Sequence, residues 1–284
     1  MSRETIPETP PVVIGGVGGS GTRAFCEMFL RGGYAMGDEL NASLDSNVLA
    51  PVINGTLNSV LARAGRADFS CADLPAAVID PVIGQTSGIL DSFAAAVPPG
   101  QTRWGMKQPR TILMLPIIEA VWPDFKFIHV IRDGRDMALS KNQNQVRFHY
   151  SALIEGRPAA YSPSPFARFA KKLGIKRRMP VGIDKSIRWW SKVNSEAADW
   201  GEARGSRRYL RIKFEDLIMH PAEILGQVES FTGEDMPQDA IAHIIKPSSV
   251  GRARRTNSRI RQRIEQLGAP ALGKFGYGAG ESAG

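Results

Sequence analysis

The stretch GGVGGSGTRAF, residues 15–25, follows the apolar run VVI at 12–14 and leads into a segment with helical spacing. A glycine-rich turn between a buried strand and a helix brings several backbone N–H groups and the positive end of the helix dipole to one point. Such a turn either binds a phosphate-like anion or serves as a tight connection. The stretch therefore raises the question of which anion it could hold.

The loop departs from both common nucleotide-binding patterns. In G-x-x-x-x-G-K-[ST], aligning Gly16 and Gly21 puts Thr22 at the lysine position and Arg23 at the position of the magnesium-binding hydroxyl. The pattern G-x-G-x-x-G fits Gly16, Gly18 and Gly21, but no acidic residue follows at the distance that a ribose requires. The loop is therefore suited to a phosphate-like group that binds without a metal ion.

Composition limits the class of protein. With 284 residues, 43% of them hydrophobic, the chain is large enough for one substantial core, and we expect a single domain over residues 1–284. No apolar stretch approaches the roughly 20 residues of a membrane span, and MSRETIPETP lacks the apolar segment of a signal peptide, so we expect a cytoplasmic protein. No cluster of histidine, cysteine or carboxylate residues has metal-ligand spacing. The net charge of +8 favours anionic partners without choosing among them.

The order of the expected elements predicts an α/β fold. Strands are expected at 12–14, 125–133 and 207–217, and helices at 23–31, 111–121, 137–147, 184–204 and 221–232. Strands separated by helices imply a three-layer arrangement, a mostly parallel sheet with helices on both faces. Residues 1–10 and 276–284 are predicted to be flexible ends, and 41–100 and 150–182 to be insertions.

A second anion-binding candidate is VIRDGRDMALS, residues 130–140. Arg132 follows a predicted strand and Ser140 lies on the next predicted helix. Ligands of open α/β sheets bind at the carboxyl ends of the strands, and the planar fork of arginine matches a phosphate group. Surface ion pairing among Arg132, Asp133, Arg135 and Asp136 is the alternative interpretation.

Together the two segments resemble the sulfotransferases that use 3′-phosphoadenosine 5′-phosphosulfate (PAPS). The family loop x-[KR]-S-G-T-[ST], which holds the 5′-phosphosulfate, is similar to residues 18–23. The family strand ending in R-x-P-x-D, with a serine eight residues after the arginine, holds the 3′-phosphate and resembles Arg132, Asp136 and Ser140. The resemblance assigns cofactor binding to the following loop residues: Gly18, Gly19, Ser20, Gly21, Thr22 and Arg23.

Later blocks extend the resemblance over most of the chain. KFEDL at 213–217 is similar to the family block Y-E-D-L, which implies that Phe214 lies near adenine. SSVGRARR at 248–255 resembles the basic glycine loop, which implies that Gly251 and Arg252 surround the 3′-phosphate. The family then implies a P-loop-like fold and transfer of a sulfuryl group, without a metal, to a hydroxyl of a small molecule, glycan or lipid. The product nucleotide would be 3′-phosphoadenosine 5′-phosphate (PAP), and 41–100 and 150–182 would bind the acceptor.

One departure concerns the cation of the loop. The family lysine or arginine corresponds to Gly19, whereas Arg23 stands where threonine or serine is usual. Because negative charge grows on the leaving oxygen, a replacement cation is expected. Lys107 lies in WGMKQPR, which is similar to a K-x-P segment whose lysine reaches the sulfuryl group. We favour Lys107 for chemistry and Arg23 for binding.

The acceptor hydroxyl also needs a base. His149 follows the predicted helix that leads toward the second insertion, and Glu39 lies where some bacterial members of the family carry an acidic base. Asp38 and Asp45 are close alternatives to Glu39. The sequence leaves the choice between His149 and Glu39 open.

Three other functions remain as alternatives. A small-molecule or nucleoside kinase would require Mg²⁺, which this loop is poorly equipped to bind. A noncatalytic nucleotide-binding module would bind without turnover. The arginine-rich run at 251–263 also suits nucleic acid, although the family resemblance gives its first part a narrower task, and we expect no nucleic-acid partner.

The segment 165–178 is interpreted as an ordinary amphipathic surface helix rather than a membrane contact. Neither the acceptor nor the oligomeric state follows from the sequence.

Overall fold

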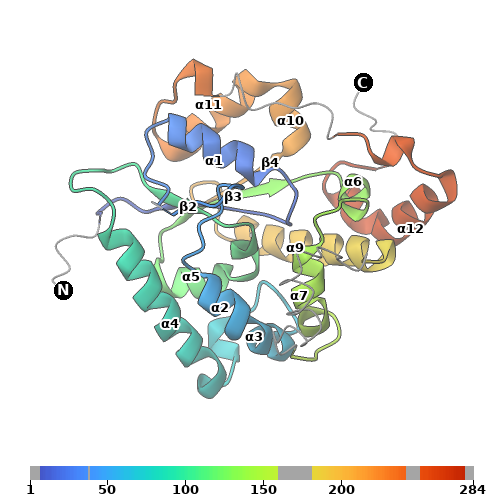
Figure 1. Ribbon diagram of the computed structural model, residues 1–284, viewed down its shortest axis with the longest axis horizontal. Helices are drawn as coiled ribbons and strands as arrows, with labels where there is room; N and C mark the ends of the chain where they lie inside the picture. The colour runs from blue at the N-terminus through green and yellow to red at the C-terminus, as the bar shows by residue number, and fades with distance from the viewer. Residues whose placement is uncertain (1–6, 38, 159–180, 241–249, 279–284) are drawn as a thin grey trace, which may run out of the picture.

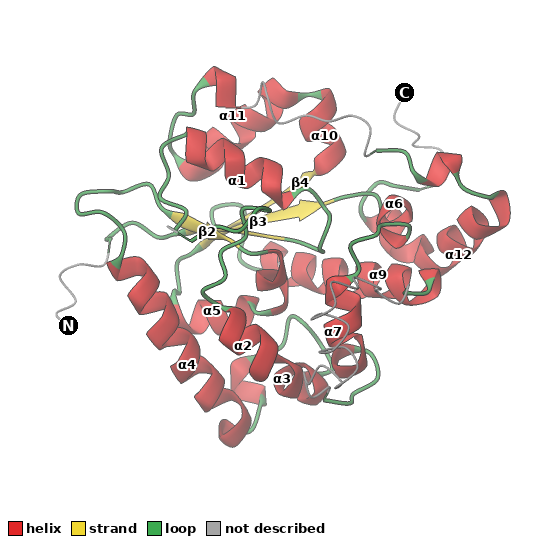
Figure 2. Ribbon diagram, viewed as in Figure 1, coloured by secondary structure: helices red, strands yellow, loops and turns green. Residues whose placement is uncertain are grey.

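The computed structural model describes residues 7–37, 39–158, 181–240 and 250–278. Within these residues, a sheet of four parallel strands forms the centre of the molecule, drawn as yellow arrows in Figure 2. The strands are β1 (Val12–Gly15), β2 (Gly105–Lys107), β3 (Lys126–Ile131) and β4 (Tyr209–Lys213). They lie in the order β2-β1-β3-β4, so the carboxyl ends of β1 and β3 meet at the centre of one edge of the sheet.

Helices cover both faces of the sheet (Figure 1). On one face lie α1 (Thr22–Arg31), α10 (Phe214–Met219) and α11 (Pro221–Thr232), whose apolar side chains share a buried cluster with Ile14, Ile128 and Val130. Val13 and Phe127 belong to the buried cluster on the opposite face. Successive residues of β1 and β3 therefore point alternately into the two cores.

The opposite face carries the larger core. Its helices are α2 (Ala50–Gly55), α3 (Leu57–Ala64), α4 (Ala76–Ala95), α5 (Leu115–Val121), α7 (Asn144–Leu153) and α9 (Ile183–Glu202). The helices α6 (Gly134–Ala138) and α12 (Ser258–Lys274) pack against α9 at the carboxyl end of the sheet (Figure 1). Short 3-10 turns complete the described chain: Cys71–Asp73, Pro109–Leu113, Gln238–Ala240 and Ala253–Arg255. The predicted α/β fold with three layers and a parallel sheet is confirmed.

Several element boundaries differ from the prediction. The helix expected at 137–147 is two helices, because the chain turns between α6 and α7 and Gln143 Nε2 donates to the carbonyls of Met137 at 2.9 Å and Ser140 at 3.0 Å. The strand expected at 207–217 ends at Lys213, and its last residues begin α10. The three-residue strand β2 was not predicted, since a glycine and a lysine flank its only apolar residue.

The predicted flexible ends are partly packed. Near the N-terminus, Trp104 Nε1 donates to the carbonyl of Thr9 at 2.8 Å. Near the C-terminus, Tyr277 is buried and its hydroxyl donates to Glu215 at 2.9 Å. Packing therefore reaches into both segments, and the remainder, 1–6 and 279–284, lies outside the described residues together with most of the predicted insertion at 150–182.

Two features are absent from the described residues. None of the helices in this part of the chain combines the length and apolar character needed to cross a membrane. Among the same residues, no group of three or more histidine, cysteine or acidic side chains is arranged to hold a metal ion.

Candidate active site

The loop between β1 and α1 depends on glycine at two positions. Gly19 has φ 102° and Gly21 has φ 104°, in the region that side chains other than glycine rarely adopt. A Cβ atom on Gly21 would lie 2.1 Å from the Phe214 ring, and one on Gly19 would lie 3.4 Å from Ser140 Oγ. The usual lysine or arginine of the sulfotransferase loop would therefore be strained at position 19, which gives a physical reason for this departure.

Polar groups of the loop fit an anion. Ser20 is 1% exposed, and its Oγ is buried without a hydrogen-bond partner among the described residues. Thr22, also buried, begins the ten-residue helix α1, whose N-terminus carries partial positive charge. An unpaired buried hydroxyl costs about 1–3 kcal/mol. A phosphate or sulfuryl oxygen beside Ser20 would remove this cost, so the loop fits the 5′-phosphosulfate of the donor.

Arg132 lies at the end of β3, beside this loop. It is 3% exposed, its Nη1 donates to the Gly19 carbonyl at 3.5 Å, and its guanidinium lies 5.1 Å from the centre of the Phe214 ring. Burial, followed by the nearby charge of Arg252, lowers the pKa of Arg132 from its ordinary value. A bound anion would oppose both effects, because it would supply negative charge where two cations approach each other.

Asp136 connects Arg132 to the C-terminal glycine loop. Its Oδ2 lies 3.6 Å from Arg132 Nη2 and accepts a hydrogen bond from the backbone N–H of Gly251 at 2.7 Å, while its Oδ1 accepts one from Ala253 at 2.8 Å. These bonds hold Arg252 near Arg132, and Arg252 Nη1 is buried without a hydrogen-bond partner in the described part of the chain. Residues 115 or more positions apart therefore converge on one basic site.

The structure thus brings most of the predicted cofactor residues together. Ser140 is half-buried against Gly19, its Oγ accepting a bond from Asn142 N at 3.2 Å. Phe214 is 9% exposed and packs between Gly21 and Arg132. The two predicted anion segments are adjacent parts of one site at the carboxyl ends of β1 and β3.

A residue that sequence reasoning missed supports the loop. Gln145, in α7, is 4% exposed, and its Nε2 donates to the Gly16 carbonyl at 3.0 Å. Its Oε1 accepts a bond from Trp189 Nε1 at 3.4 Å. No motif marks this glutamine, and the prediction of one continuous helix at 137–147 gave it no defined orientation toward the loop.

Lys107 occupies a buried position at the end of β2. It is 1% exposed, and its Nζ donates to the Ser43 carbonyl at 2.5 Å and to the carboxylate of Asp45. The backbone carbonyl of Lys107 also accepts a bond from Ser46 N at 2.8 Å. These contacts fasten the segment 43–46 to the edge strand of the sheet, and in this structure Asp45 neutralises the charge that was expected at the sulfuryl group.

The other expected catalytic groups lie in different surroundings. Arg23 is exposed in the first turn of α1, and Glu39 is exposed beside a cavity of about 420 Å³. Asp38 lies outside the described residues.

His149 lies in the core, 1% exposed. Its Nδ1 is 2.6 Å from Asn58 Oδ1, and its ring stacks on Trp189 with centroids 6.4 Å apart. Burial lowers the pKa of His149 to about 3. It therefore lacks the exposure to an acceptor that the sequence led us to expect, because α7 turns this face inward against α3 and α9.

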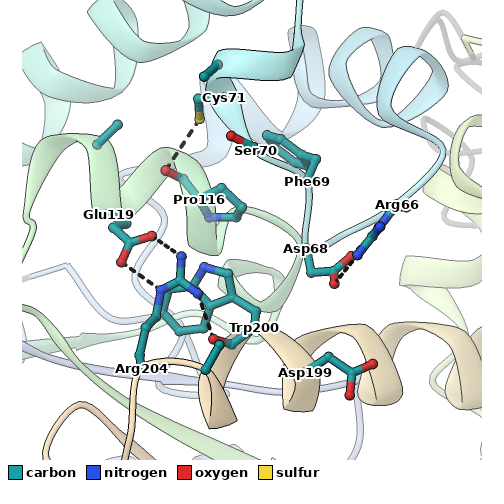
Figure 3. A pocket seen from close by; sticks show the side chains of 13 residues that line it. Arg66, Asp68, Phe69, Ser70, Cys71, Pro116, Glu119, Asp199, Trp200 and Arg204 are labelled. Atoms are coloured by element: carbon teal, nitrogen blue, oxygen red, sulfur yellow. Dashed lines mark hydrogen bonds and ion pairs between the residues drawn. The ribbon is translucent and has the colours of Figure 1, made fainter.

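Another cavity lies elsewhere in the molecule. Its volume is about 540 Å³, and it is formed beside the C-terminal ends of α5 and α9, which lead to the amino ends of β3 and β4. Figure 3 shows that Arg204 is bonded to Glu119 and Arg66 to Asp68 on its walls. None of the predicted site residues lines this cavity.

Comparison with known proteins identifies the class. The sequence profile described as "Sulfotransferase family" matches residues 84–238, more than half of the chain. The chain therefore belongs to the sulfotransferase family and is a sulfotransferase. No curated protein matches the sequence at a significant level.

One solved structure shows the same fold, and a second is reported beside it. The sulfotransferase domain of the olefin synthase of Synechococcus PCC 7002 is 15% identical with a TM-score of 0.51, over 98% of each chain. The sulfotransferase domain from the curacin biosynthetic pathway is 13% identical with a TM-score of 0.49, over 95% of this chain and 99% of that one. At these identities the likeness concerns the fold alone.

Proposed function

We propose that the protein transfers a sulfuryl group from PAPS to a hydroxyl group of its acceptor and releases PAP. One observation carries this proposal: the two candidate anion-binding segments meet at the carboxyl-terminal edge of the sheet. There, Ser20 Oγ and Arg252 Nη1 are buried without a hydrogen-bond partner among the described residues. PAPS has phosphate groups at both ends of its ribose, so it requires two such segments at a fixed separation.

Each segment would hold one end of the donor. The backbone of 18–22 and the hydroxyl of Ser20 would bind the 5′-phosphosulfate at the N-terminus of α1. Arg132, Ser140 and the Gly251–Arg252 backbone would bind the 3′-phosphate. Phe214, which packs against Gly21 and Arg132, would border the adenine. Thr22 and Arg23 replace the lysine and hydroxyl of a magnesium-dependent loop, so we propose that no metal is required.

The transfer itself requires a cation and a base. When the acceptor oxygen attacks sulfur, a new O–S bond forms, the bridging S–O bond breaks, and PAP leaves with the electron pair of that bond. We assign stabilisation of the leaving oxygen to Arg23, which is exposed beside the loop, and assign to Lys107 the task of holding the segment 43–46. The hydroxyl proton would pass to Glu39, since His149 is enclosed in the core.

Transfer of labelled sulfate from PAPS to a panel of phenols, aliphatic alcohols and sugars tests this function, with EDTA present throughout. We expect turnover in the wild type and a loss on the order of 100-fold in kcat for Arg23→Ala, with PAP affinity reduced less. Lys107→Met should mainly lower thermal stability, because it leaves Asp45 without its partner. If PAP binds but no acceptor in the panel is sulfated, the proposal of transfer to hydroxyl groups of these classes is wrong.

A further inference from the structure

We infer that the acceptor is an uncharged, largely apolar alcohol or phenol, bound in the 420 Å³ cavity between the segment 35–48 and the C-terminal half of α4. This inference rests on the proposed function and adds to it the class of acceptor. It selects one of the acceptor classes that the sequence leaves open, and it is opposed to a sugar or an anionic acceptor.

The walls of this cavity are mostly apolar. Ile89 and Phe93 come from α4, Val97 follows the end of this helix, and Ala35 and Val48 line the cavity from the other segment. Among the described residues that line the cavity, the polar side chains are those of Glu39, Ser46 and Ser92. Small-molecule sites of this size are typically apolar with a few polar groups that fix the orientation of the ligand. A sugar would leave most of its hydroxyl groups without hydrogen-bond partners on such walls.

Glycine residues keep this cavity open. Gly88 lines it from α4, and a Cβ atom at this position would meet nothing within 4 Å. Gly37 has φ 91°, and a Cβ there would lie 2.7 Å from the Phe93 ring, so the chain approaches the aromatic wall closely only because this residue is glycine. A larger side chain at position 88 would therefore extend into space that a ligand could occupy.

Backbone bonds connect the cavity to the donor site. Ala35 and Ser46 both lie along the outer edge of β2: Gly105 N donates to the Ala35 carbonyl at 2.9 Å, and Ser46 N donates to the Lys107 carbonyl at 2.8 Å. Lys107 is the register partner of Ile14, the residue just before the glycine loop begins. The Ser46 wall is thus one strand away from the strand that carries the loop.

The carboxylate of Glu39 limits which acceptors the cavity can bind. It is the one charged side chain among the described residues that line the cavity, so an anionic acceptor would be repelled, whereas a neutral hydroxyl could donate to its carboxylate. In the transfer, the hydroxyl oxygen would form the bond to sulfur, its proton would move to the Glu39 carboxylate, and PAP would leave with the electrons of the broken S–O bond.

Calorimetric titration with 2-naphthol tests the inference, with N-acetylglucosamine as the polar comparison, each with and without saturating PAP. Gly88→Leu should fill the cavity. Gly84→Leu is the matched control, because Gly84 lies one turn earlier on α4, is also exposed, has free space around its Cβ position and does not line the cavity. Both substitutions should favour the helix to the same degree.

We expect 2-naphthol to bind the wild type and Gly84→Leu equally, to bind Gly88→Leu at least tenfold more weakly, and to bind better than the sugar. PAP affinity should be the same in all three proteins. Equal naphthol binding by the two variants, preference for the sugar, or no naphthol binding beside normal PAP binding would overturn the inference and leave the proposed function intact. Failure of PAP to bind would instead contradict the proposed function itself.

Discussion

Two regions of the molecule gather arginine residues, and they differ in how the positive charges are compensated. Beside the ends of α5 and α9, Arg204 is bonded to Glu119, Arg66 to Asp68, and Asp199 to Lys274. At the carboxyl ends of β1 and β3, the buried Arg132 and the nearby Arg252 lie beside one carboxylate, Asp136, and polar atoms of Ser20 and Arg252 have no partner among the described residues.

The difference shows that a cavity rich in charged side chains is not by itself an anion-binding site in this protein. The cavity beside α5 and α9 has charges that already neutralise one another, so an added ligand would have to compete with existing ion pairs. At the carboxyl ends of β1 and β3, Ser20 Oγ and Arg252 Nη1 are buried without a hydrogen-bond partner among the described residues, which is unfavourable until an anion binds. We therefore place the reaction at the donor site, and substitutions in the two regions should have different effects.

Replacement of an arginine in each region should give the largest contrast. Arg132→Ala should weaken PAP binding about 100-fold, equivalent to about 2.8 kcal/mol, because a buried guanidinium makes charge-assisted bonds to phosphate. Arg204→Ala should leave PAP affinity within about twofold, although it breaks the ion pair with Glu119. Calorimetry on both variants measures the contrast, and similar losses in the two would mean that PAP does not bind where we place it.

A smaller contrast is expected between neighbouring glycines of the loop. Gly19→Ala should weaken PAP binding about tenfold, since the substitution strains a backbone at φ 102° by about 1–3 kcal/mol. Gly18→Ala should change it by less than about threefold, because its Cβ would make only ordinary contacts, 3.6 Å from Asn142. Fluorescence titration of both variants with PAP would measure this, and equal affinities would show that the loop conformation at Gly19 is not needed for the nucleotide.

The smallest expected effect concerns the core histidine. Because the pKa of His149 is lowered to about 3 by burial, the unfolded chain binds its proton near pH 6.5 and the folded chain does not. Stability should therefore fall as the pH drops through 6.5, by about 0.7 kcal/mol between pH 7 and 6 for this histidine. Urea unfolding at pH 7 and pH 6 measures this. The decrease in the free energy of unfolding between the two pH values should be smaller by that amount in His149→Gln than in the wild type. An unchanged pH dependence would mean that His149 is accessible to protons in the folded protein.

Local sequence was sufficient for the parts of the site that are close together along the chain. The spacing of Arg132 and Ser140 and the glycines of the loop predicted both anion segments, because a strand end and the following turn fix their direction within a few residues. The order of strands and helices likewise predicted the three-layer fold.

Contacts between distant segments decided the rest. Gln145 reaches Gly16 across 129 positions and Lys107 reaches Asp45 across 62, and neither contact leaves a local pattern. The orientation of His149 depends on how α7 packs against α3 and α9, which the sequence periodicity did not specify. The edge strand β2 is too short to show a β-strand pattern at all.

The central claim is that the site binds a nucleotide with two separate phosphate ends and without a metal. Calorimetric titration of the EDTA-treated protein with PAP, beside ADP alone and ATP with Mg²⁺, tests it most directly. The account predicts tight binding of PAP alone and at least tenfold weaker binding of the other two, a difference of about 1.4 kcal/mol or more. Preference for ATP with Mg²⁺ would contradict it and would favour a phosphoryl-transfer site instead.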